Sequence, residues 1–436
     1  MSLIIDCIYL LAAAAISPMV AYRMVRYKRY RAGWAQRFGR ITRRYPAKKC
    51  IWLHAVSVGE VNASRTIIEE LRKKLADFEI VISTTTDTGF SRANELFGAN
   101  HSVFYFPLDF SLVMRRAFDN IRPAICLLVE LEVWPNFVQI AHQSNIPVVI
   151  INGRISDRSF SKYKKIKLVV KNIFKKVDLV LAQTDQYAQR FKEIGCLAEK
   201  VIVTGSLKYD TAQVADKVDG SDVLAKQLFI KIENPLWVAG GTGPDEEKII
   251  LDVYRRLKEQ DRFENLRLAI IPRKPERFDE VAQLIKQSGF DIIRYSQIKN
   301  HSTEKSNTEP RATSHESRIT LGDTMGDLRK FYSVADLIFV GRSLVPMGGS
   351  DMMEAAALGK CTIFGPYAFN FQQAVDDLLA NQGAIMVRDE QELFVTMQKC
   401  LLEPAFAQTI ARNGQEIIKK NQGSTAKSVD AIMKLL

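Results

Sequence analysis

A carboxylate that directly follows an apolar run is the first residue of this sequence that could carry chemistry. The run 51–55 (Ile-Trp-Leu-His-Ala) leads through Ser57 and Gly59 to Glu60, and apolar residues then recur at helical spacing. This order places Glu60 at the carboxyl end of a strand and at the start of a helix. A carboxylate there could act as a general base toward an attacking hydroxyl, or it could only compensate the helix dipole. Position alone leaves both interpretations open.

A second acidic segment follows another apolar run. After residues 125–129 the chain reads Glu130-Leu-Glu132-Val-Trp-Pro-Asn. Two carboxylates before a Trp-Pro break are poor candidates for the hydrophobic core, because burying a charge is costly unless it is paired. We expect Glu130 and Glu132 to orient an acceptor or the base, with a helix cap or an ion pair as the alternative role.

Two segments of the second half could hold an anion. Residues 239–244 (Ala-Gly-Gly-Thr-Gly-Pro) lie between a predicted strand and a predicted helix, where a phosphate could approach the backbone and free N–H groups. Three acids at 245–247 would oppose that anion. The next strand ends with Arg273, Lys274 and Arg277, which could neutralise a leaving phosphate or simply be solvated.

The order of elements around residues 339–371 is typical of nucleotide-sugar pockets. A strand leads to a glycine pair (Gly348-Gly349), a helix with one inward acid (Glu354), another strand and a Gly-Pro turn. Glu354 is expected to face a ribose. No zinc-ligand spacing, Walker loop or nucleophile elbow occurs in the sequence, and the five histidines are scattered. We therefore expect chemistry without a metal or other cofactor.

The elements that must position these residues alternate along the whole chain. Its 436 residues, 47% of them hydrophobic, allow two or three domains, and six cysteines without a CxxC pair fit a reducing compartment. Short apolar runs alternate with amphipathic stretches, which predicts parallel sheets with helical crossovers. The predicted strands are 51–55, 80–83, 103–106, 125–129, 148–152, 179–182 and 201–203 in the first half and 236–239, 268–271, 292–295, 337–340, 362–364 and 385–387 in the second. The fold class is α/β, with two doubly wound Rossmann-like domains and ligands at the carboxyl ends of the strands.

The N-terminus has the pattern of a membrane anchor. Residues 7–22 carry no charge, and the next acid after Asp6 is Glu60. The span is short for a bilayer, so it either just crosses or lies in one leaflet. A basic collar follows, which favours a cytoplasmic location for the rest of the chain and contact with anionic lipid: Arg23, Arg26, Lys28, Arg29, Arg31, Arg37, Arg40, Arg43, Arg44, Lys48 and Lys49. Nucleic acid is not expected as a partner, because no nucleic-acid-binding motif accompanies these charges.

The predicted organisation is therefore an anchor followed by two domains. The boundaries are 1–22 for the anchor, 23–49 for the basic membrane-proximal segment, 50–205 for the first domain, 206–230 for a linker, 231–410 for the second domain with a polar surface insertion at 296–318, and 411–436 for C-terminal helices that could pack back on the first domain.

Several ordered motifs resemble the 3-deoxy-D-manno-octulosonic acid (Kdo) transferases of lipopolysaccharide synthesis. The similarity covers nearly the whole chain and includes the anchor and its collar and the segments 54–60, 85–89, 105–109, 130–136, 152–159, 204–210, 272–277, 322–328 and 365–371. The resemblance implies a GT-B fold whose two domains face each other across a cleft. It also implies a CMP-Kdo donor on the C-terminal domain, a lipid A precursor (lipid IVA) on the N-terminal domain, and work at the cytoplasmic face of the inner membrane.

The resemblance also implies roles for individual residues. Glu60 would be the base of an inverting transfer, supported by Glu130 and Glu132. The remaining expected contacts are, for the donor, Thr242, Arg273, Lys274, Met325, Gly326, Gly349, Asp351, Glu354 and Asn370, and for the acceptor, Ser57, Gly59, Arg154 and Lys208.

The donor half departs from the family pattern. Family members usually have Gly-Gly-His-Asn where this chain has Gly-Gly-Ser350-Asp351, and His where it has Gly243 and Lys274. A modified Kdo or another nucleotide sugar is therefore an alternative donor. An inactive lipid-binding relative is the alternative from another functional class.

Overall fold

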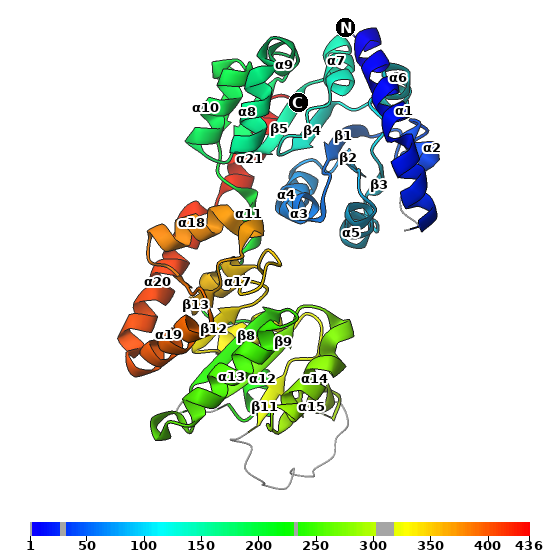
Figure 1. Cartoon of the computed structure of the whole chain (residues 1–436). Helices are drawn as coiled ribbons and strands as arrows, with labels where there is room; N and C mark the ends of the chain where they lie inside the picture. The colour runs from blue at the N-terminus through cyan, green and yellow to red at the C-terminus, as the bar shows by residue number, and fades with distance from the viewer. Residues whose placement is uncertain (1, 27–31, 231–233, 302–317) are drawn as a thin grey trace. The chain divides into compact units, whose positions relative to one another are not determined.

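The computed structural model describes residues 2–26, 32–230, 234–301 and 318–436, and these form two compact units. One unit comprises residues 1–211 and 421–436 and the other residues 212–420. Each unit is built on a parallel sheet with helices on both faces (Figure 1). The predicted pair of doubly wound α/β domains is therefore confirmed.

The first sheet has the strand order β3-β2-β1-β4-β5-β6-β7 among the described residues, with every neighbouring pair parallel. Its order reverses between β1 and β4, and ligands of such folds bind at the carboxyl ends of the strands on either side of that switch point. The strands are β1 (Lys49–His54), β2 (Phe78–Thr84), β3 (Ser102–Tyr105), β4 (Ile125–Val129), β5 (Val148–Gly153), β6 (Leu179–Ala182) and β7 (Val201–Val203).

Alternation along β1 shows how the core of this unit is divided. Ile51 and Leu53 pack into one apolar cluster with α3, α4 and α21, whereas Trp52 faces the other side of the sheet among aromatic residues of α6 and α7. The helices of the unit are α1 (Ser2–Arg26), α2 (Trp34–Arg37), α3 (Val58–Ala63), α4 (Arg65–Lys74), α5 (Asp87–Phe97), α6 (Ser111–Ile121), α7 (Pro135–Gln143), α8 (Asp157–Lys165), α9 (Lys167–Phe174), α10 (Asp185–Ile194), α11 (Leu207–Thr211) and α21 (Ser424–Met433).

The second sheet repeats this design. Its order is β10-β11-β9-β8-β12-β13-β14 in the described part of the chain, so its switch point lies between β8 and β12. The strands are β8 (Leu236–Thr242), β9 (Arg267–Pro272), β10 (Ile292–Arg294), β11 (Ile319–Leu321), β12 (Leu337–Val340), β13 (Cys361–Phe364) and β14 (Ile385–Met386). The helices are α12 (Ser221–Gln227), α13 (Glu246–Lys258), α14 (Phe278–Gln287), α15 (Tyr295–His301), α16 (Leu328–Val334), α17 (Met352–Ala357), α18 (Gln372–Ala380), α19 (Glu390–Leu402) and α20 (Pro404–Asn421).

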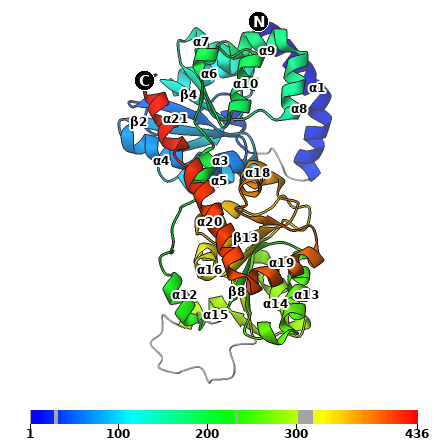
Figure 2. The ribbon, with the colours of Figure 1, turned by 90° about the vertical axis from the view of Figure 1, so that its left-hand side faces the viewer.

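The C-terminal helix returns to the first unit. Figure 2 shows α21 beside α4, and the Thr66 and Thr425 hydroxyls lie 2.8 Å apart across this contact. The Asp210 carboxylate on α11 also accepts the Gly423 N–H at 2.7 Å just before α21 begins. The C-terminal residues therefore complete the fold of the N-terminal unit.

The first residues of the surface insertion predicted at 296–318 belong to a helix. Residues 295–301 form α15, and β11 follows directly after Arg318. Residues 302–317 lie outside the described part of the chain. The strand β11 was not predicted, because three residues after a polar run give too short an apolar pattern to recognise.

The N-terminal helix α1 packs on α6 and α7 through polar groups. The Asp6 carboxylate accepts the Ser111 N–H and the Asn136 side-chain amide, both at 2.9 Å, and the Tyr9 hydroxyl donates to Asp109 at 3.0 Å. Ile4, Ile8, Leu10 and Leu11 remain more than half exposed. None of the helices in residues 2–26, 32–230, 234–301 and 318–436 has an apolar stretch long enough to cross a bilayer.

Part of the predicted basic collar has a structural role instead. Arg37 is buried, donates to the Thr85 carbonyl at 3.2 Å and stacks over the Tyr105 ring. Arg43 is also buried and pairs with Glu79 at 2.9 Å. The expectation that these two arginines contact lipid is therefore wrong, since their charges are used inside the fold. The collar residues Lys28, Arg29 and Arg31 lie outside the described residues.

Candidate active site

Glu60 lies at the switch point of the first sheet, in the first turn of α3. The Ser57 hydroxyl donates to one carboxylate oxygen at 2.8 Å, and the Val56 N–H donates to the other at 2.7 Å. Ser57 in turn caps the helix by accepting the Glu60 N–H. This reciprocal arrangement is a capping box, the structural role that the sequence left open. Glu60 is 9% exposed as a whole residue.

Glu130 and Glu132 follow β4, on the other side of the same switch point. Glu130 has a left-handed backbone with φ of 60°, which is uncommon for a residue other than glycine and is concentrated at functional sites. The Trp134 indole N–H donates to the Glu132 carboxylate at 3.2 Å. The two acids are half-buried rather than part of the core.

Electrostatics link the three carboxylates into one cluster, which we call the acidic cluster (Glu60, Glu130 and Glu132). Burial raises the pKa of Glu60, hydrogen bonds from Val56 and Ser57 act in the opposite direction, and the charge of Glu130 raises it further. Burial and then the charge of Glu60 raise the pKa of Glu132 to about 7. No cation in the described residues forms an ion pair with Glu60 or Glu132. Perturbed carboxylates at such a place are a common property of acid–base sites.

The expected acceptor contacts lie at the same edge of the sheet. Ser57 and Gly59 are in the turn before Glu60, and Gly59 is exposed. Arg154 follows β5 and Lys208 lies on α11 after β7, both half-buried. Neither cation forms an ion pair with a described carboxylate, so both are available to an anionic ligand. Trp134 was not among the predicted site residues, although the Trp-Pro break beside the acids was a signal for it.

On the second unit, Glu354 and Asp351 form a close acidic pair at the start of α17. Asp351 caps the helix by accepting the Met353 N–H at 2.9 Å. Burial and the charge of Asp351 raise the pKa of Glu354 to about 7, and the charges of Arg329 and Arg273 oppose this shift. Arg273 is exposed and has no carboxylate partner among the described residues. Arg329, on α16, was missed in the sequence, although a basic residue one turn after Gly326 was the available signal.

Three expected donor contacts have other partners. Thr242 is only 1% exposed, and its hydroxyl donates to Glu247 at 2.8 Å. Arg277 is buried against Glu247 and Glu280, at 2.6 and 2.7 Å, so it cannot neutralise a phosphate at the surface. Lys274 is exposed and lies 3.6 Å from Glu276. The side chains of Thr242 and Arg277 are therefore structural, whereas Arg273 keeps its predicted availability.

The remaining predicted donor residues surround short loops at the carboxyl edge of the second sheet. Met325 is 64% exposed, and Gly326 has a φ of 85° that a residue with a Cβ rarely adopts. The Asn370 N–H donates to the Gly348 carbonyl at 3.1 Å, which joins the loop after β13 to the glycine pair. A Cβ on Gly349 would lie 3.0 Å from the Ala368 Cα, and the φ of 81° at this position also favours glycine.

Comparison with known proteins identifies the family. A family model described as 3-deoxy-D-manno-octulosonic-acid transferase matches residues 32–211. A 3-deoxy-D-manno-octulosonic acid transferase of Haemophilus influenzae is 32% identical over 94% of this chain and 92% of its own length. The chain belongs to the Kdo transferase family. A Kdo transferase of Bordetella pertussis is 29% identical over 98% of both chains, so the relationship includes both units. The resemblance seen in the sequence is thus confirmed, and the protein is an enzyme of a glycosyltransferase family.

Solved structures with the fold of this Kdo transferase family member are more distant. A glycosyltransferase from Rickettsia africae superposes with a TM-score of 0.56 at 14% identity, covering 89% of this chain and 99% of its own. UDP-GlcNAc 2-epimerase from Neisseria meningitidis gives 0.54 at 14% identity, over 88% and 100%. At this identity the likeness concerns the fold alone. In the described residues no group of three or more His, Cys, Asp or Glu side chains could hold a metal ion.

Proposed function

We propose that this protein transfers Kdo from CMP-Kdo to a lipid A precursor such as lipid IVA, by an inverting displacement in which Glu60 is the general base. The observation that carries the proposal is the acidic cluster at the first switch point of a Kdo transferase family member. Burial raises the pKa of both Glu60 and Glu132, and hydrogen bonds from Val56 and Ser57 oppose this shift at Glu60 by stabilising its ionised form.

The proposed step balances with this one base. The acceptor hydroxyl oxygen attacks the anomeric carbon of Kdo and gives its proton to Glu60. The bond from that carbon to the phosphate oxygen of CMP breaks, and CMP leaves with the electron pair. A capped carboxylate suits this role, since Val56 N–H and Ser57 O–H hold its orientation while each oxygen retains a further lone pair.

The donor is assigned to the second unit. CMP carries one phosphate, and Arg273 is an exposed cation at the end of β9 that can pair with it. Glu354 and Asn370 would contact the nucleoside. Two of the altered residues of this half make internal contacts: the Ser350 hydroxyl donates to the Gly241 carbonyl at 2.8 Å, and Asp351 caps α17. Both residues are therefore compatible with an intact donor site.

The proposed location is the cytoplasmic face of the inner membrane, with α1 lying in one leaflet. Its exposed apolar residues, Leu11 at 74% among them, would enter the lipid, while Asp6 and Tyr9 hold the helix to the catalytic unit. Anionic lipid would be attracted by collar residues that remain exposed, such as Arg26 and Arg40.

Mass spectrometry of a reaction tests the proposal. The purified protein is incubated with CMP-Kdo and a tetraacylated, bisphosphorylated acceptor lipid, and the product is expected to gain the mass of one or more Kdo residues. Calorimetry with CMP and UDP tests the donor separately. Tight binding of UDP without binding of CMP would contradict the Kdo assignment, and binding of acceptor lipid without any product would favour the inactive relative.

A further inference from the structure

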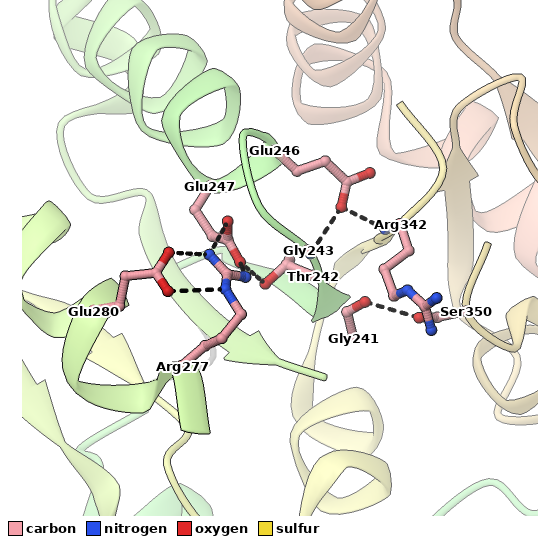
Figure 3. A network of polar contacts seen from close by, with 9 residues as sticks. All are labelled: Gly241, Thr242, Gly243, Glu246, Glu247, Arg277, Glu280, Arg342 and Ser350. Atoms are coloured by element: carbon pink, nitrogen blue, oxygen red, sulfur yellow. Dashed lines mark hydrogen bonds and ion pairs between the residues drawn. The ribbon is translucent and has the colours of Figure 1, made fainter. Parts of the chain in front are cut away.

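One buried carboxylate joins two loops of the second unit. Glu246, the first residue of α13, is 0% exposed, and its two oxygens accept four main-chain N–H groups. One oxygen accepts the Gly243 N–H at 3.1 Å and the Arg342 N–H; the other accepts the Ser343 and Leu344 N–H groups at 2.6 and 2.8 Å. Figure 3 shows the Glu246 side chain reaching from the start of α13 toward Gly243 and Arg342.

This arrangement is an anion nest whose anion is a side chain. Arg342 has a φ of 58°, and this left-handed residue turns the three consecutive N–H groups of residues 342–344 toward one point. Successive N–H groups turned in this way commonly hold phosphates and other anions. Glu246 fills the position, and no cation of the described residues forms an ion pair with it. The Gly243 N–H, which the sequence suggested as a phosphate contact, is therefore not free, because the Glu246 carboxylate already occupies it.

The two joined loops flank the switch point of the second sheet. Gly243 follows β8 and residues 342–344 follow β12, and these strands are neighbours. The network continues outward: the Ser350 N–H donates to the Gly341 carbonyl, and the Ser343 hydroxyl accepts the Gly365 N–H at 2.8 Å. The loops that carry Gly349, Asp351 and Asn370 are thus connected to the same carboxylate.

We propose that Glu246 is a positioning residue for donor binding, whose carboxylate fixes the loops after β8 and β12 in the geometry that the nucleotide sugar requires. The inference rests on the proposed function for the identity of the donor, CMP-Kdo, but not for the structural role of Glu246. Without the carboxylate, four main-chain N–H groups lose their acceptor, two of them in the buried residues Gly243 and Ser343, and unpaired buried donors are costly enough to rearrange the loops.

Glu246→Gln is the informative substitution. The side-chain volume is nearly unchanged, but the amide NH2 of the glutamine would face main-chain N–H groups on one side of the nest. We expect the KM for the donor and the Kd for CMP to rise by about tenfold or more. The KM for the acceptor lipid should stay within about twofold, because the acidic cluster belongs to the other unit. Glu246→Asp keeps the charge but is shorter, so it should restore part of the CMP affinity.

Glu79→Gln is the matched control. Glu79 is also buried, at 4% exposure, and accepts the Arg44 and Tyr45 N–H groups at 2.9 and 3.2 Å. It lies at the amino end of β2 in the first unit, whereas all predicted donor contacts belong to the second unit. Its loss should lower the melting temperature without raising the Kd for CMP. If Glu246→Gln and Glu79→Gln have the same Kd for CMP as the wild type, Glu246 is only a stabilising residue and the proposal is wrong.

Hydrogen exchange of the wild type provides a test that needs no variant. The amides of Gly243 and residues 342–344 should be protected in the absence of nucleotide, because their acceptor is part of the chain. Exchange as fast as in exposed loops would overturn the proposal even if Glu246→Gln does not fold. Failure of the wild type to bind CMP would instead contradict the proposed function, and it would leave this protection unchanged.

Discussion

Glu60→Gln separates the two roles that the structure allows for Glu60. A capping box accepts Glu or Gln at this position, so a residue needed only for capping would tolerate the change. The Gln carbonyl oxygen can accept the Val56 N–H, and the Ser57 hydroxyl can rotate to accept from the new amide group. Both contacts survive, but the side chain can no longer take a proton.

The expected magnitudes differ enough to decide between the roles. Reversing one hydrogen bond should cost at most about 1 kcal/mol of unfolding free energy, which corresponds to roughly 2–4 °C in Tm for a unit of this size. Loss of a general base lowers kcat by about 10²–10⁴-fold, or roughly 3–5 kcal/mol in the activation barrier. The rate should therefore fall far more than the stability.

The assay measures Kdo transfer and thermal unfolding for three proteins: the wild type, Glu60→Gln and Glu392→Gln. Glu392 is in a second capping box, where it accepts the Arg388 N–H and donates its own N–H to Asp389, both at 2.8 Å. Glu392→Gln should leave kcat unchanged. If Glu60→Gln keeps kcat within about twofold of the wild type, Glu60 is a cap and not the base, and the proposed mechanism is refuted.

Three further predictions test the acidic cluster, the donor site and α1. Below the pKa of Glu60 its carboxylate is protonated, so kcat/KM should fall toward acid pH. Glu130→Gln removes a charge that raises this pKa, so the variant should show the fall in kcat/KM at a lower pH than the wild type. An unchanged pH profile would exclude coupling between Glu60 and Glu130. Arg273→Ala should raise the KM for the donor by about tenfold through loss of a charged phosphate contact, with the KM for the acceptor as the internal control. Leu11→Glu should reduce flotation with anionic vesicles, whereas Val395→Glu, at a site 50% exposed on α19, should not; equal flotation of both would contradict insertion of α1.

Much of the fold could be predicted from the sequence, because a parallel strand buried on both faces gives a continuous apolar run. All seven strands of the first sheet were predicted close to their observed positions. In the second sheet β11 was not predicted, because its three residues, 319–321, include only two apolar ones and follow a polar stretch. This short segment is a strand because it pairs with β10 on one side and β9 on the other. A local sequence pattern does not contain this pairing.

The site was predictable to the extent that it follows from the sheet. Glu60 and Glu132 follow apolar runs, and parallel strands bring such positions to one edge. The partners of buried charges were not predictable, because they come from distant parts of the chain. Arg43 pairs with Glu79, 36 residues away, and Glu246 accepts N–H groups nearly 100 residues away. Composition alone assigned Arg43 to the lipid surface, whereas the neutralising partner decides its role.

The two sheets place an acid at the same topological position and use it differently. Glu60 and Glu246 each lie in the first turn of the helix after the first strand of their unit, at the switch point. The loop after β4 presents further carboxylates to Glu60, which raises proton affinity and makes acid–base chemistry available. The loop after β12 presents main-chain N–H groups to Glu246, which consume its lone pairs and leave it a structural role. What the neighbouring loop offers, a negative charge or a hydrogen-bond donor, therefore distinguishes the proposed base, Glu60, from the proposed positioning residue, Glu246.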